Sequence, residues 1–173
     1  MAILGKRVRE HFPRLADFVR SLLPEVENRR RTWNAFLEWS ELSERLARMA
    51  LMRDTGPYVG VTSVGSFNGV FRPDTPRVVF LHVKVARLFE TRVRGSRLLV
   101  ESTLLHELVR WGNYVGKYSL DSRELHNKQR ADGKKRGGYA KAGGELREVG
   151  KQFERQAYGR DVNYGDNPSV AAK

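Results

Sequence analysis

The first 52 residues of the chain carry apolar side chains at the spacing of α-helices. The run over 13–23 predicts one helix, with Pro13 suited to its first turn and Pro24 ending it. A second, longer helix is predicted over 25–52. Its expected buried stripe comprises Val26, Trp33, Phe36, Leu37, Leu46 and Met49. Together the two segments predict an N-terminal helical hairpin.

The pattern changes to that of short β-strands between residues 54 and 83. Over 54–76, Gly, Thr, Ser and Pro are interspersed with β-branched and aromatic residues, which is typical of strands joined by turns. The segment 77–89 begins as the clearest strand of the chain, and its second half favours a helix. One face of this strand is predicted to carry Val78, Phe80 and His82, and the other face Val79, Leu81 and Val83.

The last third of the chain returns to helical spacing. A mostly buried helix is predicted over 97–115, because its apolar side is broad. The polar, basic and glycine-bearing segment 116–143 predicts a long mobile loop, of the kind that often serves as a lid. A final helix is predicted over 144–157, and an unstructured tail over 161–173. The predicted fold class is therefore α+β and mainly helical.

Composition restricts the chemistry that the chain can perform. It has no cysteine, which excludes disulfides and thiolate metal sites. Any metal site must therefore combine Asp and Glu with the four histidines His11, His82, His106 and His126. The net charge of +12 is spread along the chain without the interleaved aromatic residues of single-strand binders, so a nucleic-acid partner is the less favoured interpretation. No apolar run is long enough to span a membrane, and no secretory signal is expected.

The strongest chemical motif is TLLHELVRWG, residues 103–112. On a helix, the side chain four residues after His106 lies on the same face one turn away, where two imidazoles can hold one metal ion. Glu107 then occupies the position of the general base in H-E-x-x-H peptidases. In the last predicted helix, Glu154 lies between the apolar residues Phe153 and Ala157 and is the candidate for a third ligand.

Arg110 breaks this motif at the position of the second histidine. A guanidinium group has no lone pair to donate and stays protonated, so Arg110 cannot be a metal ligand. On an apolar helix face its charge requires carboxylate partners, and we expect Glu107 and Glu154 to fill that role. An alternative interpretation follows, in which the chain is a non-catalytic binding module and Arg110 is a permanent ion-pair hub.

Two stretches, STLLHELVRWGN and GKQFERQAYG, resemble the bacterial metallopeptidase toxin domains of the zincin group. Such domains occur in polymorphic toxins and as C-terminal effector domains of type VI secretion spike proteins of the VgrG type. The family pattern is approximately T-L-L-H-E-L-x-H-W-G followed by F-E-x-x-x-Y-G. The resemblance implies a zinc ion with His106 and Glu154 as ligands, and Glu107 as the catalytic acid/base. Position 110 is the second histidine ligand in the family; His126 is the alternative imidazole, but it lies in the predicted loop.

The resemblance also sets the expected domain organisation. We expect a single domain over 1–173, with an N-terminal helical part over 1–52 and a flexible tail over 161–173. The zincin-like core over 56–160 is expected to combine an active-site helix with a short β-sheet.

The function implied by the resemblance is hydrolysis of peptide bonds by an antibacterial or host-directed toxin effector. Such an effector is delivered into the periplasm or cytoplasm of a target cell as part of a larger secreted protein. The implied partners are a protein or peptide substrate and an immunity protein. Because Arg110 replaces a histidine ligand, whether by engineering or in a natural pseudoenzyme, we expect this form to be metal-poor or inactive. A basic effector that targets nucleic acid is the remaining alternative.

Overall fold

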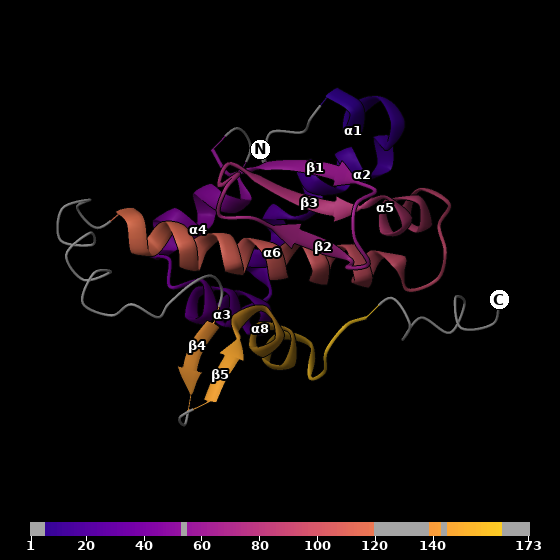
Figure 1. Cartoon of the computed structure of the whole chain (residues 1–173). Helices are drawn as coiled ribbons and strands as arrows, with labels where there is room; N and C mark the ends of the chain where they lie inside the picture. Colours follow the sequence, from indigo (N-terminus) through magenta and orange to yellow (C-terminus); the bar gives the residue numbers. More distant parts are fainter. Residues whose placement is uncertain (1–5, 53–54, 120–138, 143–144, 164–173) are drawn as a thin grey trace.

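The computed structural model describes residues 6–52, 55–119, 139–142 and 145–163 (Figure 1). The chain begins with short helical segments: α1 (Lys6–His11), α2 (Pro13–Asp17), the π-helical η1 (Phe18–Leu22) and the 3-10 helix η2 (Pro24–Asn28). The predicted helix over 13–23 is therefore confirmed as helical, although its second half is a π-helix. Pro24 begins a new helical turn, which its fixed φ favours at a first position.

The single helix predicted over 25–52 is wrong, because the structure contains two α-helices there, α3 (Arg30–Ser40) and α4 (Glu44–Leu51). Glu41 leaves the helical region with a φ of 57°, in the left-handed conformation that ends many helices. Ser43 then caps α4 by accepting a 3.4 Å hydrogen bond from the amide of Leu46. The apolar spacing continues across this break, so periodicity alone conceals it.

Three short strands form a mixed sheet in the order β1-β3-β2. These strands are β1 (Tyr58–Thr62), β2 (Gly69–Phe71) and β3 (Val78–His82). The central strand β3 runs parallel to β1 and antiparallel to β2. The predicted change from strand to helix is confirmed, since α5 (Val83–Glu90) follows β3 directly. Nδ1 of His82 caps α5 by accepting a 3.2 Å hydrogen bond from the amide of Lys84.

The long helix α6 (Ser96–Ser119) confirms and extends the helix predicted over 97–115. Figure 1 shows it crossing the molecule with the sheet on one side and α3 on the other, and both contact it. Its core-facing residues are almost fully buried: Leu99, Val100, Leu104, Leu105, Leu108 and Val109. A helix enclosed on two sides holds its side chains in fixed positions, which suits a site that depends on side-chain geometry.

The C-terminal part differs from its prediction. The segment 116–143 is not a loop throughout, because α6 continues to residue 119 and β4 (Tyr139–Ala142) lies at the other end; the remainder falls outside the described residues. Strand β5 (Glu145–Glu148) pairs antiparallel with β4 and leads into α8 (Val149–Tyr158). The predicted helix over 144–157 therefore starts too early, because 145–148 form strand β5 and the helix begins at Val149. Most of the predicted tail over 161–173 lies outside the described residues.

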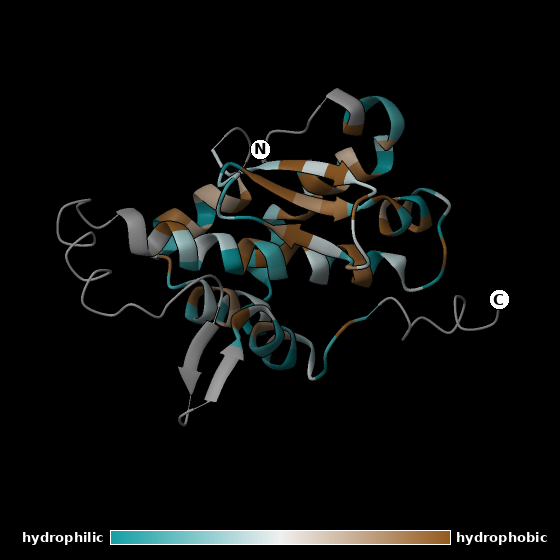
Figure 2. Cartoon of the chain, viewed as in Figure 1, coloured by the Kyte–Doolittle hydropathy of each residue, from teal (hydrophilic) through white to brown (hydrophobic). Residues whose placement is uncertain are grey.

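The hydrophobic core joins these elements. Figure 2 shows hydrophobic residues along the strands of the sheet, and Val79 and Leu81 of β3 are fully buried. On the other side of α6, the rings of Phe36 in α3 and Phe153 in α8 meet edge to face with their centroids 6.4 Å apart. Buried aromatic pairs of this kind contribute strongly to packing. Helix α8 packs against both α3 and α6, and this ring contact contributes to its position. The functional side chains described next depend on the position of α8.

Candidate active site

His106 and Glu154 lie in contact, although 48 positions separate them in the sequence. Nδ1 of His106 donates a hydrogen bond of 2.6 Å to Oε1 of Glu154, from α6 to α8. The other oxygen of Glu154 accepts a 2.7 Å hydrogen bond from the amide of Val162. The Glu154 side chain is only 4% exposed, and its two oxygens are both engaged. It therefore holds the His106 ring in one orientation.

Glu148 is a residue of this site that the sequence analysis did not identify. It is the N-cap of α8, and its carboxylate accepts hydrogen bonds from the amides of Gly150 (3.1 Å) and Lys151 (2.8 Å). Its Oε2 lies 3.3 Å from Nε2 of His106. The last helix was predicted over 144–157, a range that contains Glu148. The sequence feature that could have identified Glu148 is its carboxylate close to the start of a helix, where a negative charge interacts favourably with the free backbone amides.

Glu107 is buried between α6 and the sheet. Its Oε2 accepts a 2.7 Å hydrogen bond from the amide of Phe71, at the end of β2. Burial raises the pKa of Glu107, and the positive charges of His106 and Arg110 oppose this shift. Oε1 of the same carboxylate is 4.0 Å from Nε2 of His106. The edge strand of the sheet and the central helix thus jointly position the carboxylate expected to act as the base.

Arg110 pairs with two carboxylates, one of which differs from the prediction. Its Nη1 donates to Oε2 of Glu107 at 3.2 Å, as expected for neighbours three apart on a helix. Its Nε lies 3.7 Å from Oε1 of Glu148, and not of Glu154 as the sequence analysis expected. This Nε is buried and has no hydrogen-bond partner in the described part of the chain. Glu154 is directed to His106 instead, which explains the difference.

The carboxylates around His106 keep its ring charged. Burial alone would lower the pKa of His106, but the hydrogen bonds to Glu148 and Glu154 and the charge of Glu107 outweigh it and raise the pKa to about 9. Burial would raise the pKa of Glu148, but His106 and the two amides at the start of α8 outweigh burial and lower it. The site therefore places one imidazole and one guanidinium among three carboxyl groups.

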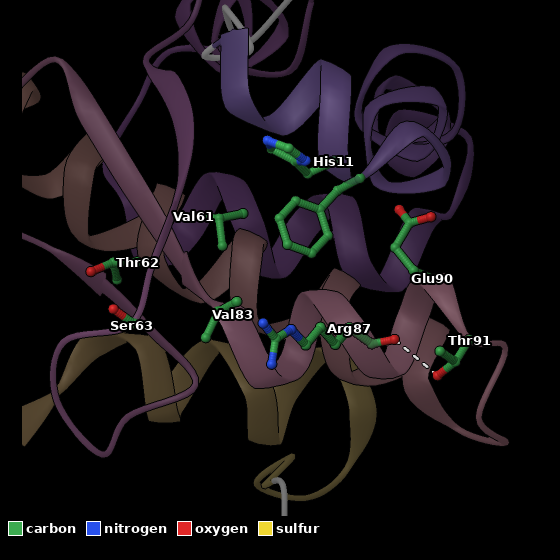
Figure 3. A pocket seen from close by; sticks show the side chains of 9 residues that line it. His11, Val61, Thr62, Ser63, Val83, Arg87, Glu90 and Thr91 are labelled. Carbon is green, nitrogen blue, oxygen red and sulfur yellow. Dashed lines mark hydrogen bonds between the residues drawn. The ribbon is translucent and has the colours of Figure 1, made fainter.

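A hollow lies elsewhere on the molecule. It has a volume of about 450 Å³, and its walls come from β1, α5 and the chain around His11 (Figure 3). None of the residues of the His106 network lines it. Glu90, on its wall, serves the fold, because its carboxylate accepts hydrogen bonds from the amides of Arg14 (3.3 Å) and Leu15 (2.8 Å) in α2.

The comparison with protein families identifies the chain. A family model, metallopeptidase toxin 3, matches residues 8–159. The chain belongs to this family. No curated protein and no solved structure shows significant similarity to it. Membership confirms the resemblance found in the sequence, and it implies protein substrates, delivery to target cells and a metal ion.

The residues of this family member, as they stand, do not fit a metal ion. Within the described ranges, no group of three or more His, Asp or Glu side chains is arranged to hold one. Both ring nitrogens of His106 face carboxylates, and the guanidinium of Arg110 lies between Glu107 and Glu148. A guanidinium cannot coordinate a cation and repels it at this distance. The position that the family motif gives to a ligand is thus filled by a positive charge.

Of the other histidines, the two that the structure describes, His11 and His82, take no part in the network. His82 is buried and caps α5, His11 is exposed at the end of α1, and His126 lies outside the described residues. None of the helices in the described part of the chain is both long and apolar enough to cross a membrane.

Proposed function

We propose that this metallopeptidase toxin 3 member is a peptide-bond-hydrolysing effector domain whose present form is metal-poor and inactive because of Arg110. It is an antibacterial or host-directed toxin, carried into the target cell as part of a larger secreted protein. Family membership supports the peptidase class. The proposal assigns Glu107 the role of the base and His106 that of a zinc ligand, which are the roles of these residues in H-E-x-x-H enzymes.

The ion pair between Arg110 and Glu107 is the observation that carries this proposal. The base of such an enzyme needs a carboxylate that accepts a proton from water. In this structure Oε2 of Glu107 accepts from Phe71 and from Arg110, Oε1 lies 4.0 Å from Nε2 of His106, and the side chain is only 5% exposed. The positive charge of Arg110 also acts to lower the pKa of this carboxyl group and so weakens it as a base. The same guanidinium supplies the positive charge that the surrounding carboxylates require. The pocket is thereby electrostatically satisfied without a metal ion.

The proposal is tested by the substitution Arg110→His. Zinc content is measured by elemental analysis on protein purified without chelator, and peptide cleavage is measured on the same samples. We expect about one zinc per chain and protease activity in Arg110→His, and neither in the unchanged chain. Arg45→His is the matched control, because Arg45 is exposed on α4.

The ion pairs of Arg110 also support a second function, that of a non-catalytic binding module, which applies if Arg110→His takes up no zinc. Arg110 would then be a permanent part of the fold, and the chain a non-catalytic binding module. A buried charged network is compatible with such a role because it fixes local geometry without chemistry. Failure of carefully loaded Arg110→His to retain zinc would therefore replace the peptidase proposal with the binding-module proposal.

A further inference from the structure

A second hollow lies where the end of α5 meets the start of α6, on the right of the molecule in Figure 1. Its volume is about 270 Å³. Pockets for drug-sized ligands have about 300–1,000 Å³, so this hollow suits a smaller molecule. None of the residues that line it belongs to the His106 network. Ser96 on its wall precedes His106 by ten positions, which is about 15 Å along the helix.

Three arginines line this hollow, Arg14, Arg92 and Arg97, and no described Asp or Glu does. Nη1 of Arg14 donates to the carbonyl oxygens of Phe89 (2.7 Å) and Glu90 (3.0 Å), which holds its guanidinium in place. Within the described ranges, neither Arg92 nor Arg97 forms an ion pair with a carboxylate. Guanidinium groups that share one hollow without an acidic side chain are suited to bind an anion.

The hollow also includes the start of α6. The first hydrogen bond of this helix runs from the amide of Leu99 to the carbonyl oxygen of Gly95, at 3.1 Å, so Gly95 is the N-cap residue. Glycine has no side chain that could cap the amides of the first turn, and that turn contains no Asp or Glu. The start of a helix carries a partial positive charge and attracts anions. The helix therefore adds its field to that of the three arginines.

The hydroxyl of Ser96 distinguishes this hollow from a merely basic surface. Ser96 lines the hollow and is only 3% exposed. Its hydroxyl forms no hydrogen bond with any of the residues that the structure describes, and its oxygen is not fully enclosed by protein. Buried hydroxyl groups normally have a partner, because an unpaired one costs free energy. A ligand in the hollow would supply the acceptor.

The rest of the wall is apolar, and it indicates what the anion is attached to. Leu22, Phe89 and Val93 lie there, and Phe89 is buried. An organic group beside the anion would bury apolar surface against them, whereas a simple inorganic ion would not. Three guanidinium groups also favour a ligand with more than one negative charge. A phosphate ester carries two above its second pKa of about 6, and a carboxylate carries one.

We propose that this hollow binds the phosphate group of an organic phosphate monoester. The three arginines, the Ser96 hydroxyl and the start of α6 contact the phosphate, and the apolar wall contacts the organic group. The site goes beyond the proposed function and needs neither zinc nor peptidase activity, so its failure would leave that proposal unchanged. The same phosphate chemistry occurs in soluble compounds and in the headgroup of phosphatidic acid.

The test is a titration of the unchanged, ¹⁵N-labelled chain with phenyl phosphate, inorganic phosphate and benzoate, followed by NMR. The pH is kept above the second pKa of the phosphate ester, and the ionic strength is held constant because salt screens charges. Phenyl phosphate should shift the amide signals of residues 95–98. It should bind about tenfold more tightly than inorganic phosphate, because its ring contacts the apolar wall. Benzoate, with one charge, should bind more weakly than phenyl phosphate.

Four substitutions assign the binding to this hollow. Arg97→Gln should weaken phenyl phosphate binding by about 10–100-fold, and Ser96→Ala by about 3–10-fold, as expected for a charged and a neutral hydrogen bond. Arg94→Gln is the matched control, because Arg94 is an exposed neighbour that does not line the hollow. Arg92→Gly separates binding from folding. Arg92 has a φ of 60°, which glycine adopts readily, so this variant should keep its circular dichroism and lose affinity.

Vesicles of phosphatidylcholine with and without phosphatidic acid distinguish the two sources of the phosphate. Sedimentation with phosphatidic acid that Arg97→Gln abolishes and Arg94→Gln retains would assign the phosphate to a lipid headgroup. Binding of phenyl phosphate without such sedimentation would assign it to a soluble ester. The proposal is overturned if phenyl phosphate shifts no amide signal of residues 95–98, or if benzoate binds equally well. It is also overturned if Arg94→Gln weakens binding as much as Arg97→Gln does.

Discussion

Nη1 of Arg110 lies 3.2 Å from Oε2 of Glu107, about one turn away on the same helix, and the two side chains form an ion pair. The Glu107 side chain is only 5% exposed, so its charge is stabilised by Arg110, His106 and the amide of Phe71 rather than by water. Removing one partner of a buried pair leaves the other charge uncompensated. The unchanged chain should therefore depend on Arg110 for stability.

Arg110→Met tests this dependence, because methionine keeps the apolar stem and removes the charge. We expect the free energy of unfolding at neutral pH to fall by about 1–3 kcal/mol, below the usual loss for a fully buried pair because the Arg110 side chain is 27% exposed. Adding Glu107→Gln should recover most of the loss, since no buried charge then lacks a partner. Urea unfolding of the single and double variants measures the loss of unfolding free energy and its recovery. An effect no larger than that of Arg45→Met, at an exposed position, would contradict the expected coupling.

Gly150→Ala is expected to disturb the site at the His106 ring. The new Cβ would overlap the His106 ring, so the ring or the start of α8 must move. Overpacking at a buried position costs about 1–3 kcal/mol. Unfolding by urea measures the loss, and the His106 ring signals in an NMR spectrum report whether the ring has turned. Gln152→Ala, two residues further along α8, is the control; if the two substitutions behave alike, the close approach of Gly150 to the ring is unimportant.

Much of this fold follows from local patterns in the sequence. The helix that carries His106 and the strand that begins at Val78 were predictable, because their apolar spacing matches their burial in the core. The break at Glu41 was not, since a left-handed residue interrupts a helix without interrupting the periodicity. Long-range contacts set the site. Glu154 was predictable from its apolar neighbours Phe153 and Ala157 and from the family pattern. Glu148 was not, because its role depends on the position at which α8 begins.

Tyr158 provides a prediction on the pH dependence of stability. Burial, and then the charge of Glu101, raise the pKa of Tyr158 well above its usual value; its hydroxyl donates to Oε1 of Glu101 at 3.0 Å. A raised folded-state pKa contributes stability below the unfolded value of about 10, and this contribution is lost as pH rises above that value. As the pH is raised from below to above about 10, the free energy of unfolding should fall more steeply in the unchanged chain than in Tyr158→Phe.

The same substitution gives a direct measurement on the folded protein. If the Tyr158 phenol stays neutral, the folded chain and Tyr158→Phe should show equal phenolate absorbance about one pH unit above the usual tyrosine pKa of about 10. A larger absorbance in the unchanged chain would mean that Tyr158 ionises normally and that its buried bond to Glu101 does not persist in solution.

The last prediction concerns the coupling between zinc and stability in Arg110→His. An ion that binds only the folded state stabilises it by an amount that grows with the free ion concentration, about 2.7 kcal/mol at one hundred times the Kd. The melting temperature of Arg110→His should therefore rise when zinc is added, whereas that of the unchanged chain should not. Adding Glu107→Ala to Arg110→His should keep the zinc-dependent rise and abolish peptide cleavage, because the base is removed while the proposed ligands remain. Cleavage that survives in the double variant would show that Glu107 is not the base, and a loss of the thermal shift would place Glu107 among the ligands.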